Sequence, residues 1–127
     1  MLPGCSVLVV DPLEETREVL RTALGRRGVR ILAASEADQG LALARLHHPD
    51  LIVLDLECEG ANAGASGKIA AQSLADETQL LVLGNARRVA PELPAGQFVP
   101  KPYHYAPLIR KIEELLEKAR QPASRAG

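Results

Sequence analysis

Short aliphatic runs alternate with segments of helical periodicity along this chain, and that alternation constrains the fold more than any other feature. The runs lack the polar–apolar alternation of half-exposed strands, as expected for strands buried on both faces of a parallel sheet. We therefore predict an α/β fold, a doubly wound five-stranded parallel sheet with helices on both faces. The strands are expected at residues 6–10, 29–34, 51–54, 80–83 and 97–99.

Helices are predicted between the strands from the spacing of their apolar residues. The expected helices are residues 14–27, a segment with Ser35 as N-cap that ends before Pro49, residues 68–75 and residues 105–120. Residues 85–96 contain two prolines, so one or two turns of helix at most fit there. The helix before the fifth strand is thus expected to be shortened or missing.

Length and composition narrow the class of protein. The 127 residues suit one domain, predicted over residues 1–120 with a flexible tail at 121–127. Three aromatic residues and a net charge of −1 argue against direct nucleic-acid binding. The apolar runs are far shorter than the roughly 20 residues that span a membrane. Two cysteines and the lack of a secretory pattern favour the cytoplasm.

Four residues follow or end the strands at the positions where α/β proteins bind ligands, the carboxyl ends of parallel strands. These residues are Asp11, Asp55, Gly84 and Lys101. Two adjacent carboxylates repel each other unless a cation lies between them, and oxygen ligands suit Mg²⁺. A carboxylate beside a divalent cation and a lysine can accept a phosphoryl group. Spacing alone leaves open that Asp11 and Asp55 only cap loops at the sheet edge.

Several stretches together carry a resemblance to a known family. They are Val7–Asp11, Arg17, Pro49–Asp55 and Phe98–Pro102, in this order and with matching separations. With them the chain resembles the response-regulator receiver domain of two-component signalling, over residues 6 to about 118. The resemblance implies the flavodoxin-like strand order 2-1-3-4-5.

The resemblance also implies roles for individual residues. Asp55 would be the phosphoacceptor and Lys101 the phosphoryl contact. Asp11 and Asp55 would bind Mg²⁺, with Glu57 at the position that usually offers its backbone carbonyl. The resemblance further marks Gly84 and Phe98 as the switch positions.

Four departures from the family pattern make this an atypical member. Pro12 replaces the second of two adjacent acids, so one direct metal ligand is missing. Gly84 replaces the switch Ser or Thr and offers no hydroxyl to a phosphoryl oxygen. Cys58 and Glu59 replace the usual Met-Pro, and the segment from Gly84 to Lys101 is short. We therefore expect weak Mg²⁺ binding and an impaired switch.

Three functions follow, in order of preference. The first is a receiver whose Asp55 accepts a phosphoryl group from a histidine kinase and which acts through a downstream protein partner, not as an enzyme. The second is a pseudo-receiver, a protein-interaction module independent of phosphorylation. The third, a small hydrolase with Asp55 as nucleophile, is disfavoured because Glu57 stands where the dehalogenase-like pattern has Asp.

Overall fold

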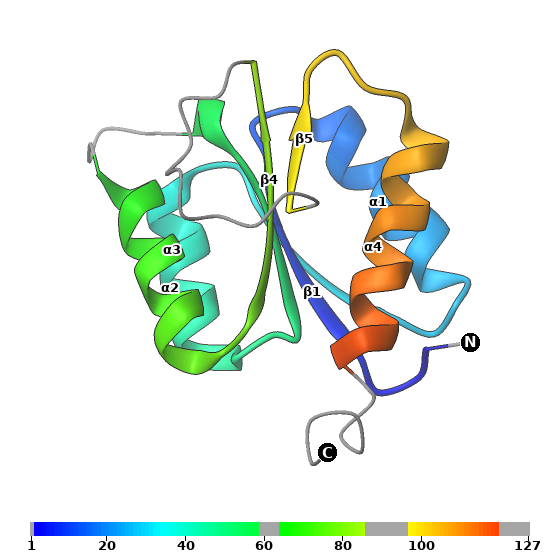
Figure 1. The fold of residues 1–127 in the computed structure, drawn as a ribbon, viewed down its shortest axis with the longest axis horizontal. Coiled ribbons are helices and arrows are strands. Elements are labelled where there is room, and N and C mark those ends of the chain that lie inside the picture. The colour runs from blue at the N-terminus through cyan, green and yellow to red at the C-terminus, as the bar shows by residue number, and fades with distance from the viewer. Residues whose placement is uncertain (1, 59–63, 86–96, 120–127) are drawn as a thin grey trace.

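A single sheet of five parallel strands forms the centre of the molecule, in the order β2-β1-β3-β4-β5 (Figure 1). The computed structural model describes residues 2–58, 64–85 and 97–119. The strands are β1 (Ser6–Val10), β2 (Arg30–Ala34), β3 (Leu51–Asp55), β4 (Gln79–Gly84) and β5 (Phe98–Pro100). Their carboxyl ends lie together at the upper edge of the sheet in Figure 1.

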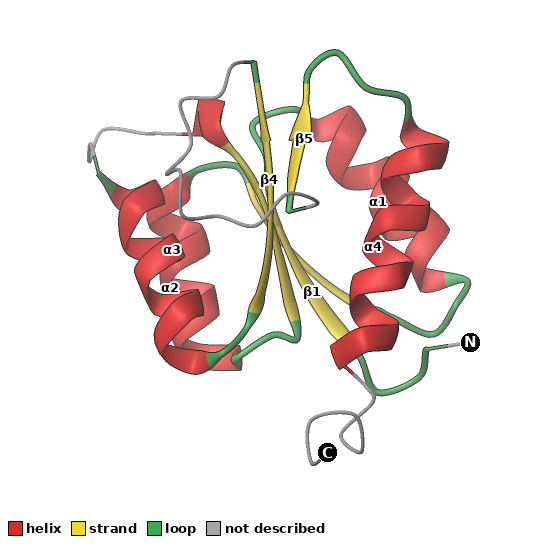
Figure 2. Cartoon of the chain, in the orientation of Figure 1, coloured by secondary structure: helices red, strands yellow, loops and turns green. Residues whose placement is uncertain are grey.

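Helices cover both faces of the sheet, as Figure 2 shows. Those in the described residues are α1 (Glu14–Gly25), α2 (Ala37–His47), α3 (Ala65–Asp76) and α4 (Tyr105–Ala119), with a short 3₁₀ helix, η1 (Leu56–Cys58). α2 and α3 lie on one face, and α1 and α4 on the other (Figure 1). This arrangement is the doubly wound α/β fold that the alternation of patterns predicted.

Two aliphatic clusters, one on each face of the sheet, make the core. The cluster under α1 and α4 includes Leu20, Leu24, Leu108 and Ile112, and the cluster under α2 and α3 includes Leu41 and Ile69. All five residues of β3 are buried, because helices cover the central strand from both sides. Burial of these side chains supplies most of the driving force for folding.

Gly40 of α2 lies close against the sheet. A Cβ at this position would lie 2.6 Å from Cγ2 of Val10, the last residue of β1. Glycine therefore lets α2 lie directly on the end of β1. This packing fixes the strand immediately before Asp11, one of the predicted site residues.

The structure confirms the fold class and the strand order and corrects details of the helices. Ser35 is not the N-cap of α2; that residue is Glu36, because the Ser35 N–H and hydroxyl both donate to the Gln39 side chain. α3 begins at Ala65, which is buried, and not at Lys68. α1 ends at Gly25, before the predicted end at Arg27.

Two predictions lie outside the described residues: the shortened helix, in residues 86–96, and the tail, in residues 120–127. Across the three described ranges, no helix combines the length and the apolar character needed to cross a membrane.

Candidate functional site

The carboxyl edge of the sheet brings Asp55 and Lys101 into contact. Asp55 ends β3, and Lys101 follows β5 and is joined to Pro102 by a cis peptide bond. The Lys101 Nζ lies 2.7 Å from Oδ2 of Asp55, whose side chain is only 1% exposed. The backbone N–H of Lys101 donates to the carbonyl of Gly84 at 2.8 Å, which ties the loop after β5 to the end of β4. The carboxylate at the end of β3 and the ammonium after β5 thus meet across the end of β4, which lies between these two strands.

Asp11 follows β1 and lies beside Asp55. Its Oδ1 accepts the backbone N–H of Leu13 at 2.9 Å, whereas its Oδ2 is buried without a hydrogen-bond donor. Arg17 donates from Nη1 to the Asp11 carbonyl at 2.7 Å and so anchors the loop to α1. Burial, opposed by the hydrogen bond from the Leu13 N–H and assisted by the charge of Asp55, raises the pKa of the Asp11 carboxyl to about 6.

The buried oxygens of Asp11 and Asp55 fit a hard cation such as Mg²⁺. An orphaned carboxylate oxygen beside a second carboxylate is costly, and a divalent cation between them removes that cost. The side-chain donor set is small, since the described ranges hold no cluster of three or more His, Cys, Asp or Glu residues that could bind a metal. Pro12 supplies no carboxylate, and Glu14 is exposed. Main-chain carbonyls and water would have to complete the coordination.

Glu57 of η1 lies beside this site, and its side chain contacts Lys101 and Asn85. Its Oε1 is 3.5 Å from the Lys101 Nζ, and its Oε2 accepts a hydrogen bond from Asn85 Nδ2 at 2.8 Å. Its backbone N–H donates to Oδ1 of Asp55 at 2.8 Å. Burial lowers the pKa of the Lys101 ammonium, but Asp55 and Glu57 more than offset this, so the pKa lies above its ordinary value.

The predicted switch positions, Gly84 and Phe98, lie on the neighbouring strands β4 and β5, and the side chains of Leu56 and Phe98 both lie against Gly84. A Cβ built on Gly84 would be 2.9 Å from Cδ1 of Leu56 and 3.4 Å from Cε1 of Phe98. The space that a Ser or Thr side chain would take is therefore filled by a leucine. This packing of Leu56 against Gly84 was not predicted from the sequence. The position of Leu56 directly after Asp55 was the feature that could have indicated it.

A group of hydroxyls on the α1 side of the site was also missed. The hydroxyls of Thr16 and Tyr105 are 3.1 Å apart and join α1 to the start of α4, and Thr16 is 1% exposed. The rings of Tyr103 and Tyr105 meet edge to face, with centroids 6.1 Å apart. Burial first, opposed by a hydrogen bond with Thr16 and assisted by the charges of Asp11 and Asp55, raises the pKa of the Tyr103 phenol. The spacing of two tyrosines just after Lys101 was the signal for this group.

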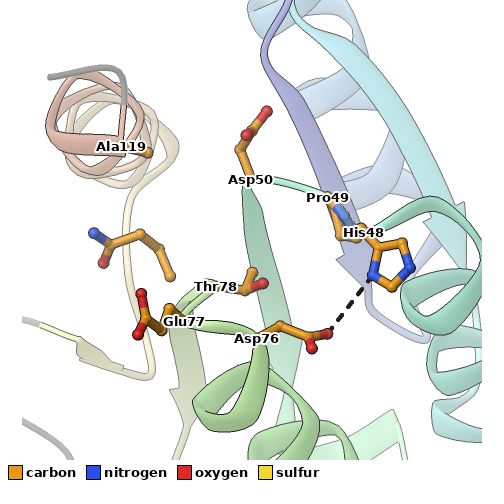
Figure 3. A pocket seen from close by; sticks show the side chains of 8 residues that line it. His48, Pro49, Asp50, Asp76, Glu77, Thr78 and Ala119 are labelled. Atoms are coloured by element: carbon orange, nitrogen blue, oxygen red, sulfur yellow. Dashed lines mark ion pairs between the residues drawn. The ribbon is translucent and has the colours of Figure 1, made fainter. Parts of the chain in front are cut away.

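A cavity of about 570 Å³ lies at the opposite edge of the sheet, away from Asp55 (Figure 3). Its lining includes Asp50, Asp76 and Glu77, and His48 lies 3.7 Å from Asp76. Asp50 instead accepts the backbone N–H of Ser6 at 2.7 Å and joins the starts of β1 and β3. These contacts are structural, and nothing among them points to a ligand.

We compared the chain with protein-family models and with curated proteins. No family model matches the chain. The chain is 29% identical over 119 residues to the "probable transcriptional regulator ycf27" of Cyanophora paradoxa, which covers 91% of this chain and 50% of that protein. Most of this chain aligns with these curated relatives, but it spans only about half of their length.

Solved receiver domains share the fold. The receiver domain of the hybrid histidine kinase CckA superposes with a TM-score of 0.66 at 21% identity, over 87% of this chain and 98% of that one. The receiver domain of the Francisella response regulator 1452 superposes with a TM-score of 0.70 at 18% identity, over 92% of this chain and 100% of that one. The chain thus has the fold of response-regulator receiver domains, and its sequence is similar to curated transcriptional regulators over about half of their length. Receiver domains of this class are signalling modules and generally not enzymes.

Proposed function

We propose that this chain is a phosphoacceptor receiver in which Asp55 takes a phosphoryl group from a histidine kinase and passes the signal to a protein partner with a weakened switch. The observation that carries the proposal is the contact of Asp55 Oδ2 with the Lys101 Nζ at 2.7 Å, beside the buried carboxyl of Asp11. Charge-assisted contacts of this kind hold a nucleophilic carboxylate and an anion-binding cation in one place.

The transfer would need no redox partner. A carboxylate oxygen of Asp55 attacks the phosphorus of a phosphohistidine, the P–N bond breaks with its electron pair going to the imidazole, and a P–O bond to Asp55 forms. Lys101, already at the carboxylate, would move to a phosphoryl oxygen and balance its charge. Asp11, Asp55 and the backbone carbonyl of Glu57 would hold Mg²⁺, which offsets the negative charge gathered in the transfer.

The switch is proposed to be weak because Gly84 presents no hydroxyl toward the phosphoryl group. A hydrogen bond to a charged group contributes about 1.5–3 kcal/mol, and losing it lowers the coupling between phosphorylation and the conformation of β4 and β5. Leu56 fills the space beside Gly84, so a rearrangement of this edge would have to move a packed side chain. Activation by phosphorylation would therefore be small in amplitude.

A second function has its own support. A pseudo-receiver that binds a partner without phosphorylation is favoured by Pro12 in place of an acid and by the filled space at Gly84. Both features would persist in a fold retained for interaction alone. The two functions differ in one measurable property, whether the carboxyl edge binds an activated phosphoryl analogue.

Binding of beryllofluoride, a tetrahedral anionic analogue of a phosphoryl group, tests the proposal. We expect ¹⁹F NMR to show a bound resonance in the presence of Mg²⁺ with the parent protein. The resonance is expected to be absent with Asp55→Asn, which removes the carboxylate while preserving the shape of the side chain. A parent protein that gives no bound resonance at millimolar beryllofluoride and Mg²⁺ would favour the pseudo-receiver.

A further inference from the structure

We propose that the hydroxyls of Thr16 and Tyr105 form a latch that positions Lys101: the latch holds the loop between β5 and α4 against α1, so that the Lys101 ammonium stays on Asp55. The inference rests on the proposed phosphoacceptor function and adds two positioning residues to it. Both hydroxyls act through Lys101 and not through contact with the phosphoryl group.

The latch lies close to Lys101 along the chain. Lys101 follows β5, and Tyr105, the first residue of α4, comes after a short loop. The hydroxyl of Tyr105 is 3.1 Å from that of Thr16, which lies in the first turn of α1 and is 1% exposed. Leaving a buried hydroxyl without a partner is costly, so this pair favours the arrangement in which the loop lies against α1. Release of Tyr105 from α1 would therefore free the loop that carries Lys101.

The latch also connects two strand ends that are not neighbours in the sheet. Asp11 follows β1 and Lys101 follows β5, and the sheet joins these two strands through β3 and β4. α1 and α4 lie on the same face of the sheet (Figure 1). The start of α1 is anchored to Asp11, because Arg17 Nη1 donates to the Asp11 carbonyl at 2.7 Å. A chain of contacts thus runs from Asp11 through Thr16 to the loop of Lys101, and it fixes the two residues that flank Asp55.

The other contacts of Lys101 make its side chain depend on the placement of this loop. The backbone N–H of Lys101 donates to the carbonyl of Gly84 at 2.8 Å, which holds one point of the loop on β4. The Nζ, 2.7 Å from Asp55 Oδ2, is at the end of a flexible four-carbon stem. A displacement of about 1 Å in a reacting group can lower a rate by up to about 100-fold. A small shift of the loop would therefore weaken the site at Asp55.

An ion pair farther along α4 provides a matched control. Arg27 Nη1, just after α1, lies 2.7 Å from Glu113 Oε2 in the middle of α4. Glu113→Ala loosens α4 from the end of α1 away from the latch. Tyr105→Phe and Thr16→Val each remove one latch hydroxyl and nearly preserve the shape of the side chain. Thr16→Ser keeps the hydroxyl and is the conservative variant.

The first measurement is hydrogen exchange of the Lys101 backbone amide, followed by NMR without metal or phosphoryl analogue. Exchange at this amide reports local opening of the loop from Gly84. We expect Tyr105→Phe and Thr16→Val to raise the exchange rate about three- to tenfold, the factor of one ordinary hydrogen bond. Thr16→Ser should stay near the parent rate. Glu113→Ala should lower the melting temperature and leave the exchange rate of Lys101 unchanged.

The second measurement is the affinity for beryllofluoride with Mg²⁺, read by ¹⁹F NMR. It should fall about three- to tenfold in Tyr105→Phe and Thr16→Val and stay at the parent value in Thr16→Ser and Glu113→Ala. Unchanged exchange in both latch variants would overturn the latch. Faster exchange with unchanged affinity, or an equal loss of affinity in Glu113→Ala, would overturn the positioning role. A parent protein that binds no beryllofluoride would overturn the phosphoacceptor function, and the exchange rates would still decide whether the latch holds the loop.

Discussion

Cδ1 of Leu56 lies 2.9 Å from the point that a Cβ on Gly84 would occupy, so two residues at the ends of neighbouring strands share one small space. Leu56 follows the phosphoacceptor candidate and Gly84 holds the predicted switch position. The leucine therefore takes the room that a hydroxyl-bearing side chain would need. Glycine in place of the family's Ser or Thr at position 84 is therefore matched by the packing of the Leu56 side chain at this edge of the sheet.

This shared space predicts an energetic coupling between the two positions. Gly84→Thr should lower the free energy of unfolding by about 1–3 kcal/mol, because the new side chain overpacks against Leu56. Leu56→Ala should relieve the overlap, so the double variant is expected to be more stable than the sum of the single changes. Urea unfolding of the four proteins measures this. Strict additivity would contradict the packing described for Gly84.

The approach of α2 to β1 predicts opposite results at two helical glycines. Gly40→Ala should destabilise the protein by about 1–3 kcal/mol, because its Cβ would lie 2.6 Å from Cγ2 of the stiff Val10 side chain. Gly67→Ala in α3 meets nothing within 4 Å and should stabilise by about 0.5–1 kcal/mol. Thermal unfolding compares the two variants. Equal changes in melting temperature for the two variants would show that Gly40 does not lie in close contact with Val10.

The raised pKa of Asp11 predicts a pH dependence of stability. The folded state holds the proton up to about pH 6, whereas the unfolded carboxyl releases it near its ordinary value of 3.8. The folded state thus binds more protons in this window, and stability falls as pH rises through it.

Asp11→Asn keeps the acceptor for Leu13 and removes the ionisation. In metal-free buffer it should therefore be more stable than the parent by roughly 1–3 kcal/mol at pH 7. The difference should vanish near pH 3.5, where Asp11 is protonated in both states. Urea unfolding between pH 3.5 and 7.5 gives both curves. A parent protein that gains stability relative to Asp11→Asn as pH rises would contradict the pKa.

Mg²⁺ should stabilise the protein at the carboxyl edge. Millimolar Mg²⁺ at pH 7.5 is expected to raise the melting temperature of the parent and to have no effect on Asp55→Asn, since a ligand that binds only the folded state stabilises it by mass action. The effect should weaken below pH 6 as Asp11 takes up a proton. Asp76→Asn, in the acidic cavity of the opposite edge, is the control and should respond like the parent. If Mg²⁺ did not raise the melting temperature of Asp76→Asn, the metal would bind in that cavity and not at the carboxyl edge.

The fold was predictable because its signals are local and redundant. The aliphatic run of β3, the helical spacing of α4 and the order of these segments each point to one architecture. The meeting of Asp11 and Asp55 also followed from sequence, since the carboxyl ends of parallel strands share an edge. The assignment of Ser35 as a cap failed because its N–H and hydroxyl both bond to the Gln39 side chain.

The finer parts of the site were beyond sequence reasoning for a physical reason. The Leu56–Gly84 contact and the Glu57–Asn85 hydrogen bond depend on side-chain rotamers and on the pairing of β3 with β4 at atomic detail. The hydroxyl contact of Thr16 with Tyr105 joins residues from opposite ends of the chain. The sequence pattern predicts that such side chains lie at the carboxyl edge of the sheet, but it does not predict which side chains they contact.

The most direct test of the account is the mass of the intact protein after incubation with phosphoramidate and Mg²⁺, followed by peptide mapping. One added phosphoryl group is expected, located on Asp55 and absent from Asp55→Asn. An unmodified parent protein, or a phosphoryl group that persists in Asp55→Asn, would contradict it.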